Sequence, residues 1–371
     1  MEDPPGKSPG NDYPLHLHAW RYVLATLALN RRMMEAQNPA ASAMPSRIGV
    51  VIIGRNEGER LRRCLVSLAK GAWQMVYVDS GSSDGSVALA RSFGAHVVIL
   101  DPTLPFTAAR ARNAGLDALR EIAPEVELVQ FVDGDCEVAD GWIERAAVEF
   151  PNDDQLAVVC GRRRERFPQA SVYNLLCDIE WDTPVGLADS CGGAAMMRVR
   201  PVVDVHGYNP DLIAGEEPDL CLRLRQRGYR IRRIEAEMTL HDANVTRFKQ
   251  WLRRTIRSGH AYAEGFTRHR REPGRFWARE VRSNLFWGAV LPAVTLGLAW
   301  PLVGLSLVAL LGYPILVLRI NHSSRLRGMT AREARTYAIF CVMGKIPSAY
   351  GQIRYWLRHA RGRRTSLIEY K

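Results

Sequence analysis

The sequence predicts an α/β domain built on a mostly parallel central sheet, followed by a helical region that associates with a membrane. Segments typical of strands and of helices alternate at short spacing from residue 47 onward, as in βαβ units. In the segment FVDGDC (131–136), two carboxylates follow an apolar run. Farther along, 34 consecutive residues (285–318) carry no charged side chain and lie between arginine-rich segments.

Residues 48–132 contain four predicted strands and three predicted helices. The strands are apolar runs rich in β-branched residues: IGVVIIG (48–54), QMVYVDS (74–80), HVVIL (96–100) and VELVQFV (126–132). The helices between them have apolar residues at helical spacing: 58–71, 82–94 and 107–122. Ligands of such sheets bind beyond the carboxyl ends of the strands. Asp79 and Asp133 are both expected at that edge.

Shifts in composition divide the chain into three parts. Residues 1–46 are polar and turn-rich and predict a flexible tail, with a short amphipathic piece near 16–33. Residues 47–245 form the predicted α/β domain, whose second half is less periodic but contains a clear helix, 218–228, with Pro218 at its first position. Residues 246–371 form the predicted basic, helical, membrane-associated region.

Charge is unevenly distributed along the chain. Residues 241–371 contain 23 lysines and arginines against 6 acidic residues, whereas residues 1–240 contain 27 against 33. A basic end beside an acidic body favours a polyanion or an anionic membrane surface as partner. Nucleic acid is not expected, because the arginines flank an apolar stretch instead of alternating with aromatic residues.

The charge-free stretch 285–318 is long for one membrane span and slightly short for two. Because both flanks are rich in arginine, both ends are expected on the cytoplasmic side, as a hairpin of two short or tilted spans or as a re-entrant hairpin. This places the protein at the cytoplasmic membrane with its α/β domain facing the cytosol. The alternative is a buried helical pair in a soluble core. The segment 336–357, broken by Lys345 and Pro347, is expected at the membrane interface.

The seven cysteines are scattered, odd in number and without a CxxC pair. This pattern predicts free thiols in a reducing cytosol and argues against a zinc site or a disulfide framework.

Asp133 and Asp135 form a D-x-D pair at the end of the fourth predicted strand. Carboxylates in this arrangement can hold Mg²⁺ or Mn²⁺, and Mg²⁺ commonly shares its coordination shell with substrate phosphates. An isolated D-G-D is more often a turn with solvated side chains. Its place at a strand end of an α/β sheet favours the metal.

Six segments in order resemble family-2 glycosyltransferases with the GT-A fold, over about residues 45–245. They are VVIIGRNEGERLRRCLVSL (51–69), VYVDSGSSDGS (76–86), ARNAGLDAL (111–119), FVDGDCEV (131–138), CGGAAMMRV (191–199) and GEEPDLCLRLRQRGY (215–229). Two positions depart from the common pattern: Ile53 stands where proline is usual, and Glu217 where aspartate often follows glutamate. The resemblance implies transfer of a sugar from a nucleotide-sugar donor to a hydroxyl acceptor with inversion.

The resemblance also implies where the donor and metal bind. The expected donor-binding residues are Asn56, Glu57, Asp79, Arg110, Arg112, Asn113 and Asp133. Arginine suits phosphate through bidentate donation, although the two arginines could instead lie on a solvated helix face and Asp79 could cap its turn. Asp133, Asp135 and His241 are the expected ligands of the divalent metal, Mn²⁺ or Mg²⁺. A lone histidine such as His241 could equally be structural.

The paired acids before the helix at 218–228 are the expected catalytic residues. Alignment with the family's Glu-Asp pair favours Glu217, with Glu216 beside it, as the base that takes the proton of the acceptor hydroxyl. The helix dipole would favour the carboxylate form, while neighbouring acids would raise the pKa. The acids could instead serve only the helix N-terminus. The acceptor pocket is expected at Trp181, Asp182, Gly192 and Gly193.

A lipid-linked or cell-envelope glycan is the expected acceptor, because of the apolar hairpin and its basic flanks. One alternative is a sugar-phosphate nucleotidyltransferase, which would leave the acids at 216–217 unexplained. Another is a non-catalytic membrane-bound scaffold that retains the fold.

Overall fold

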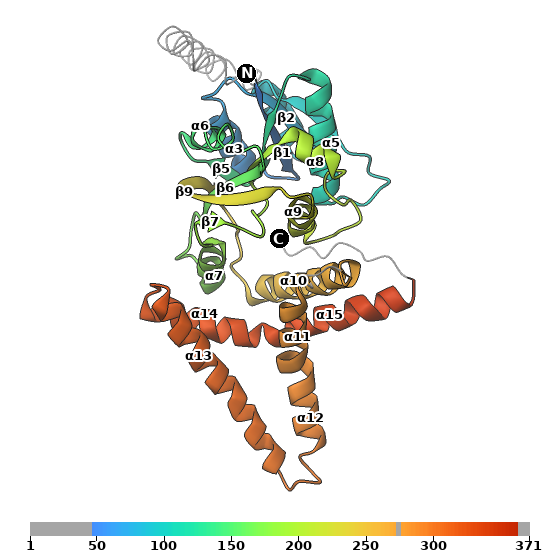
Figure 1. Cartoon of the computed structure of the whole chain (residues 1–371), viewed down its shortest axis with the longest axis vertical. Helices are drawn as coiled ribbons and strands as arrows, with labels where there is room; N and C mark the ends of the chain where they lie inside the picture. The colour runs from blue at the N-terminus through green and yellow to red at the C-terminus, as the bar shows by residue number, and fades with distance from the viewer. Residues whose placement is uncertain (1–46, 272–275, 363–371) are drawn as a thin grey trace, which may run out of the picture.

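A computed structural model of the chain describes residues 47–271 and 276–362. The α/β domain forms one end of the molecule, a layer of helices lies beneath it, and two helical legs project from the other side of that layer (Figure 1). The predicted tail, 1–46, lies outside the described residues.

A nine-stranded mixed sheet forms the centre of the α/β domain, in the order β3-β2-β1-β4-β8-β6-β9-β5, with β7 paired to β9. The first four strands are β1 Ile48–Gly54, β2 Gln74–Asp79, β3 His96–Ile99 and β4 Leu128–Asp133. They pair in parallel, as predicted from their alternation with helices. The register places Gly54 beside Asp79 and Ile53 beside Asp133, so these ends share one edge of the sheet.

The other strands turn this sheet into a mixed one. They are β5 Cys136–Val138, β6 Leu156–Glu165, β7 Gly186–Leu187, β8 Ala195–Arg198 and β9 Arg230–His241. Strand β8 runs antiparallel to both β4 and β6, whereas β6 and β9 are parallel with register shifts. The short antiparallel pair β5–β9 sets Cys136 opposite His241. This pairing brings His241, the last residue of β9, next to the DGD segment (133–135).

The helices of the α/β domain cover the sheet and close its ends. They are α3 Glu59–Leu68, α4 Ser86–Ser92, α5 Ala108–Ile122, α6 Trp142–Ala147, α7 Val172–Trp181, α8 Val199–Asp204 and α9 Glu216–Gln226. The prediction for α9 was wrong by two residues, because the helix begins at Glu216 and Pro218 is its third residue. The left-handed Gly215 (φ 82°) precedes it, so both glutamates lie in the first helical turn.

The C-terminal region is a layer of helices that packs against the α/β domain. It consists of α10 Phe248–Arg268, α11 Ala278–Leu285, α14 Ala331–Met343 and α15 Lys345–Ala360. Helices α10 and α15 approach closely because glycines face the partner backbone: a Cβ on Gly259 would lie 2.2 Å from the carbonyl oxygen of Ser348. The Lys345 ammonium donates to Ser283 and Asn284 of α11. Lys345, which interrupts the apolar pattern of 336–357, therefore joins the start of α15 to α11.

The apolar hairpin, residues 285–318, forms most of the two projecting legs (Figure 1). The first leg continues α11 through a π-helical turn, η2 Phe286–Val290, into α12 Leu291–Gly297. The second leg is η3 Leu305–Leu311 and α13 Gly312–Leu326. The legs are joined by hydrogen bonds from Ser306 Oγ to the Thr295 carbonyl, 2.7 Å, and from Tyr313 to the Trp287 carbonyl, 2.5 Å.

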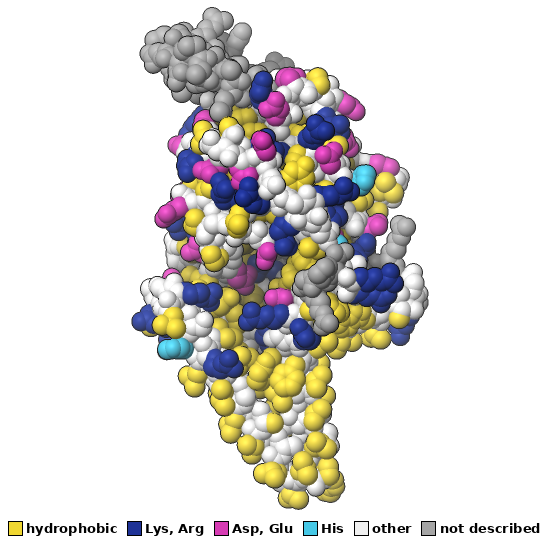
Figure 2. All heavy atoms as spheres, viewed as in Figure 1, with side chains coloured by type: hydrophobic (Ala, Val, Ile, Leu, Met, Phe, Trp, Pro, Cys, Tyr) yellow, Lys and Arg dark blue, Asp and Glu magenta, His cyan; other side chains and the backbone are white. Residues whose placement is uncertain are grey.

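The surface of the apolar hairpin is exposed. At its tip, 93% of Trp300 and 94% of Val303 are accessible, and the projecting end of the molecule carries hydrophobic side chains on the face seen in Figure 2, with Lys and Arg gathered above it. These exposures exclude the alternative of a helical pair buried within the described part of the chain. The segment Leu305–Leu326 is also long and apolar enough to cross a membrane, with mean hydropathy 1.5.

Candidate active site

A cleft of about 600 Å³ lies between the carboxyl edge of the sheet and the C-terminal helices. One side consists of the ends of β1 and β4 and the start of α9, including Asp133, Asp135, Glu216 and Glu217. The opposite side comes from α10 and the residue before α11 and includes Arg254, Arg257, Ser258, Ala261, Tyr262 and Trp277. The predicted membrane-associated region therefore forms one wall of the cleft.

Asp133, Asp135 and His241 meet in this cleft. Together with Cys136, their potential ligand atoms lie within 4.8 Å of one another. His241 Nε2 lies 3.3 Å from Asp135 Oδ1. Burial lowers the pKa of His241, although Glu165 acts in the opposite direction, so the ring is neutral at physiological pH and can offer a lone pair. Two carboxylates and a neutral imidazole form a donor set that suits Mn²⁺ or Mg²⁺.

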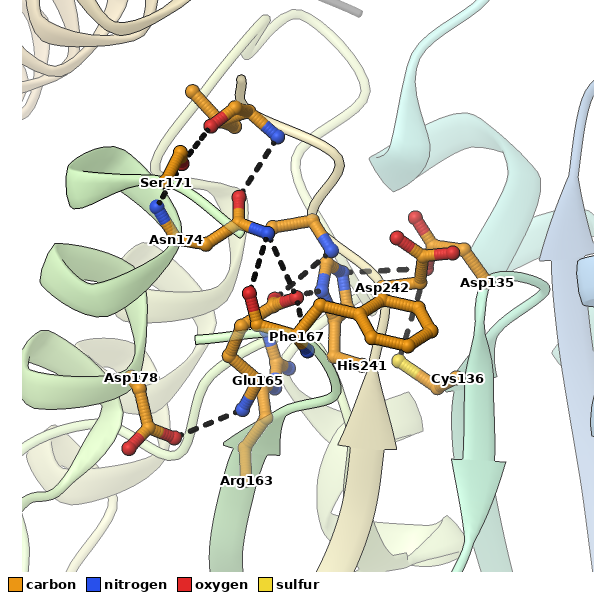
Figure 3. A network of polar contacts seen from close by, with 12 residues as sticks. Asp135, Cys136, Arg163, Glu165, Phe167, Ser171, Asn174, Asp178, His241 and Asp242 are labelled. Carbon is orange, nitrogen blue, oxygen red and sulfur yellow. Dashed lines mark hydrogen bonds and ion pairs between the residues drawn. The ribbon is translucent and has the colours of Figure 1, made fainter. Parts of the chain in front are cut away.

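Glu165, a residue that the sequence analysis missed, lies behind His241 (Figure 3). Its buried carboxylate accepts hydrogen bonds from the backbone N–H groups of Phe167 and Ala243, each at 3.0 Å, and from Asn174 Nδ2 at 3.2 Å. Glu165 Oε2 is 4.0 Å from His241 Nδ1, which has no hydrogen-bond partner among the described residues. A carboxylate behind a histidine is the usual arrangement that orients a metal-binding imidazole.

Arg112 joins the two acidic parts of the cleft. It is buried on α5 and donates from Nη2 to Asp133 Oδ1 at 2.8 Å and from Nη1 to Glu216 Oε1 at 2.9 Å. Its guanidinium also lies over the ring of Tyr208, 5.4 Å from the centroid. Arg112 was predicted to bind donor phosphates; it lines the cleft, and its partners within the chain are the Asp133 and Glu216 carboxylates.

Glu217 is buried in the first turn of α9 and lines the cleft. Its Oε1 accepts a hydrogen bond from the backbone N–H of Cys191, at 2.5 Å, and from the Cys221 thiol, at 3.1 Å. The N-terminus of α9 is in turn held by the C-terminal layer, because a Cβ on Gly215 would lie 2.9 Å from the Trp277 ring. Glu217 is therefore a fixed carboxylate, whereas Glu216 is held in an ion pair.

The other predicted donor-binding residues lie in different surroundings. Glu57 lines the cleft and forms an ion pair with Arg60 at 2.8 Å. Asn56 Oδ1 accepts from the Ser83 backbone at 2.7 Å. The Asp79 carboxylate accepts from the backbone N–H groups of Gly81 and Ser82, which is the turn-capping alternative. In the described structure, neither Asn56 nor Asp79 is among the residues that line the cleft.

Arg110 and Asn113 point away from the cleft. Arg110 donates to the carbonyl groups of Asp101 and Leu104 and thereby fixes the loop before α5. Asn113 exchanges hydrogen bonds with the backbone of Tyr208, at 2.7 and 2.8 Å. Neither residue is among the described residues that line the cleft, so their predicted contact with the donor stays a prediction, whereas Arg112 on the same helix contacts Asp133 and Glu216.

Of the predicted acceptor residues, some lie at the cleft and one lies outside its lining. Trp181 lines the cleft, and its ring meets that of His241 edge-on at 4.7 Å. Gly193 lies against Asp133, since a Cβ there would be 2.8 Å from Asp133 Oδ2, and Gly192 adopts φ +81° beside Arg163. Asp182 instead pairs with Arg162 and Arg233 and lies outside the lining that the described residues form.

Arg163 is a second residue that the sequence analysis missed. It lies on β6, lines the cleft and places its guanidinium 5.4 Å from the Trp181 ring centroid. Its Nη2 is buried without a hydrogen-bond partner among the described residues. A buried guanidinium nitrogen of this kind is suited to an anionic ligand. In the sequence Arg163 is hidden within a run of charged residues, RRRER (162–166).

We expect Glu165→Ala to lower the free energy of unfolding by about 2–5 kcal/mol, because it leaves two buried backbone N–H groups without acceptors. Glu165→Gln should cost less, since an amide oxygen can still accept one of these hydrogen bonds. Chemical denaturation in detergent measures both, with the exposed Glu125→Ala as the matched control. Equal stability of Glu165→Ala and Glu125→Ala would contradict this account.

Comparisons with known proteins agree with the fold. Residues 49–184 match the family described as Glycosyl transferase family 2. The chain is 28% identical over 260 residues to a pre-mycofactocin glycosyltransferase of Mycobacterium tuberculosis, covering 66% of this chain and 53% of that protein. It is 24% identical over 225 residues to glycosyltransferase AglE of Haloferax volcanii, covering 57% and 71%. The chain thus spans about half the length of the mycobacterial relatives it matches.

A solved structure resembles nearly the whole chain. The mannosyltransferase PcManGT of Pyrobaculum calidifontis, in complex with GDP-Man and Mn²⁺, covers 91% of this chain and 97% of its own, with a TM-score of 0.53 and 17% identity. This likeness concerns the fold. The family match covers residues 49–184, and the chain as a whole has the fold of GT-A glycosyltransferases.

Proposed function

We propose that the protein transfers a sugar from a nucleotide-sugar donor to a hydroxyl acceptor at the surface of the cytoplasmic membrane, with inversion and with the help of a divalent metal. One observation carries the proposal: a single cleft holds Asp133, Asp135 and His241 at one position and Glu217 at another. Sugar transfer needs a site for a leaving diphosphate and a base for the acceptor hydroxyl, and these two groups of residues match those needs.

Asp133, Asp135 and His241 would hold Mn²⁺ or Mg²⁺, which neutralises charge on the departing diphosphate. The PcManGT structure contains Mn²⁺ beside GDP-Man, a combination that the acids and histidine of this chain also suit. Arg163, whose buried Nη2 has no hydrogen-bond partner among the described residues, would donate to the same anion. Gly193 lets Asp133 and Arg112 pack against its backbone, because a Cβ there would lie 2.8 Å from Asp133 Oδ2 and 2.9 Å from Arg112 Nη2.

Glu217 would take the proton of the acceptor hydroxyl as its oxygen attacks the anomeric carbon. The hydrogen bonds from Cys191 N–H and from the Cys221 thiol both go to Oε1, and they hold the carboxylate in the first turn of α9. Glu216 is the weaker candidate for the base because its ion pair with Arg112 competes for the same lone pairs.

The proposed membrane association rests on the exposed apolar hairpin and on the arginines that flank it in the sequence. Arg279 and Arg282 precede the charge-free stretch, and Arg319 and Arg325 follow it. Apolar side chains would enter the bilayer while these arginines remain at anionic headgroups. The cleft would then lie close to the membrane surface, where the hydroxyl of a lipid-linked or cell-envelope glycan could reach Glu217.

Metal-dependent release of nucleoside diphosphate is the first test. We expect the purified protein to hydrolyse one member of a panel of UDP-, GDP- and dTDP-sugars slowly with Mn²⁺ or Mg²⁺. Because the metal contributes several kcal/mol, EDTA or Asp135→Asn should lower the rate by at least roughly 100-fold. The exposed Asp140→Asn is the matched control. Absence of turnover and of donor binding for every nucleotide sugar would favour the scaffold alternative.

The base is tested by Glu217→Gln, which keeps an oxygen for the Cys191 N–H but cannot take a proton. We expect the hydrolysis rate to fall by roughly 10²–10⁴-fold while donor binding, followed by tryptophan fluorescence, stays close to that of the parent protein. Glu235→Gln, an exposed change on β9, serves as the control. A parental rate in Glu217→Gln would assign the base elsewhere.

The hairpin is tested by vesicle flotation with anionic lipid. Each carboxylate placed in the bilayer costs about 2.5–3.5 kcal/mol at its centre. We therefore expect the double change Trp300→Glu and Val303→Glu to reduce the floated fraction strongly. Leu187→Glu, at a residue that is also exposed but lies on the α/β domain, should float like the parent. Flotation of the double variant at the parental level would contradict membrane insertion.

A further inference from the structure

Two cysteines flank the Glu217 carboxylate, and beyond the hydrogen bonds that position Glu217 they have no role in the chemistry described above. Cys191 lies in the loop before β8, and Cys221 lies on α9, one helical turn after Glu217. The two sulfur atoms are 3.7 Å apart. Cys221 Sγ is 3.1 Å from Glu217 Oε1, and potential ligand atoms of all three residues lie within 4.8 Å of one another.

This spacing matches the tetrahedral coordination of zinc. Zn–S bonds of about 2.3 Å at tetrahedral angles separate two sulfur ligands by roughly 3.8 Å, and a carboxylate oxygen is a common further ligand. Glu217 and Cys221, at i and i+4, face the same side of α9. Cys191 completes the set from a loop next to Gly192, whose φ of +81° is a conformation that glycine adopts readily.

We propose that Cys191, Glu217 and Cys221 form a second metal site, specific for a thiophilic divalent cation such as Zn²⁺ and distinct from the site at Asp133, Asp135 and His241. Soft thiolate ligands select Zn²⁺, whereas Mg²⁺ and Mn²⁺ prefer the oxygen-rich site. Since Glu217 lines the cleft, the ion can enter from there, and a water molecule can fill the fourth position.

Binding of Zn²⁺ releases the protons of the Cys191 and Cys221 thiols. Without metal, burial raises the pKa of the Cys191 thiol well above its ordinary value. For Cys221, the hydrogen bond with Cys191 acts to lower the pKa, but burial and the Glu217 charge outweigh it and raise the pKa to about 11. Both thiols are therefore protonated in the metal-free protein. When Zn²⁺ binds, each S–H proton passes to solvent and a Zn–S bond takes its place.

The consequence for activity rests on the proposed function of Glu217. A carboxylate bound to Zn²⁺ cannot take the acceptor proton, so occupation of this site would inhibit transfer even with Mn²⁺ in excess. The thiol site would thus make the enzyme sensitive to zinc through a position that is separate from its activating metal.

Cobalt spectroscopy tests the site directly. The reduced, metal-free full chain in detergent is titrated with Co²⁺, whose thiolate complexes have a charge-transfer band. We expect this band in the parent protein, its loss in Cys191→Ser and in Cys221→Ser, and its bleaching by added Zn²⁺. Cys136→Ser is the essential control, because Cys136 belongs to the other ligand cluster. It should keep the band, as should Asp135→Asn.

Each result decides the proposal. A missing band in the parent, a band that survives both Cys191→Ser and Cys221→Ser, or a band lost in Cys136→Ser would overturn it. If a serine variant is less stable than the parent, the site is tested instead by X-ray absorption spectroscopy of zinc bound to the parent protein. Two sulfur neighbours of the zinc are expected, and any other number contradicts the site.

An activity measurement separates this proposal from the proposed function. With Mn²⁺ in excess, we expect Zn²⁺ to inhibit donor hydrolysis. The Zn²⁺ concentration that gives half-inhibition should be at least roughly tenfold higher in Cys221→Ser, because loss of even an outer partner of a metal site lowers metal affinity about 10–100-fold. Hydrolysis unaffected by Zn²⁺ in a protein that shows the cobalt band would remove the inhibitory role. Absence of any hydrolysis would count against the proposed function, while the cobalt band would still decide the site.

Discussion

The buried ion pairs of Arg112 hold the cleft together. Its guanidinium lies between Asp133, at the end of β4, and Glu216, at the start of α9, two positions far apart in the sequence. Loss of one partner of a buried ion pair typically costs 3–5 kcal/mol, because the remaining charge is left uncompensated. Arg112 thus links the end of β4 to the first turn of α9, where Glu217 lies.

The second constraint is that the cleft is shared between the α/β domain and the C-terminal helices. Helix α10 supplies Arg254 and Arg257 to the lining, and His269, the residue after this helix, bonds Asp219 on α9 at 2.7 Å. Burial alone would raise the pKa of Asp219, but the hydrogen bonds from His269 and Arg223 lower it. The layer that carries the apolar hairpin is thus tied to the helix that carries Glu217, so the C-terminal region and the proposed base are held together.

Local patterns were sufficient for the first half of the fold. Apolar runs separated by helical periodicity predicted β1 to β4 and their parallel order, and with them the position of Asp133 at the strand edge. The second half was less predictable because its strands pair with partners distant in the sequence. The β5–β9 pair sets His241 beside Asp135, and no local pattern encodes that pairing. Side-chain direction on α5 also depends on packing: Arg112 lines the cleft, whereas Arg110 and Asn113 are not among its described lining residues.

The sequence by itself determined the order of strands and helices, the acids at 133, 135, 216 and 217, and a charge-free hairpin between arginines, since each depends on residue type and spacing along the chain. Only the tertiary structure decided which of these residues meet. It placed Glu165 behind His241, Arg163 in the cleft, and Cys191 beside Cys221. Glu165 and His241 are 76 positions apart, and Cys191 and Cys221 are 30 apart. Such contacts follow from packing and strand register, which no single segment contains.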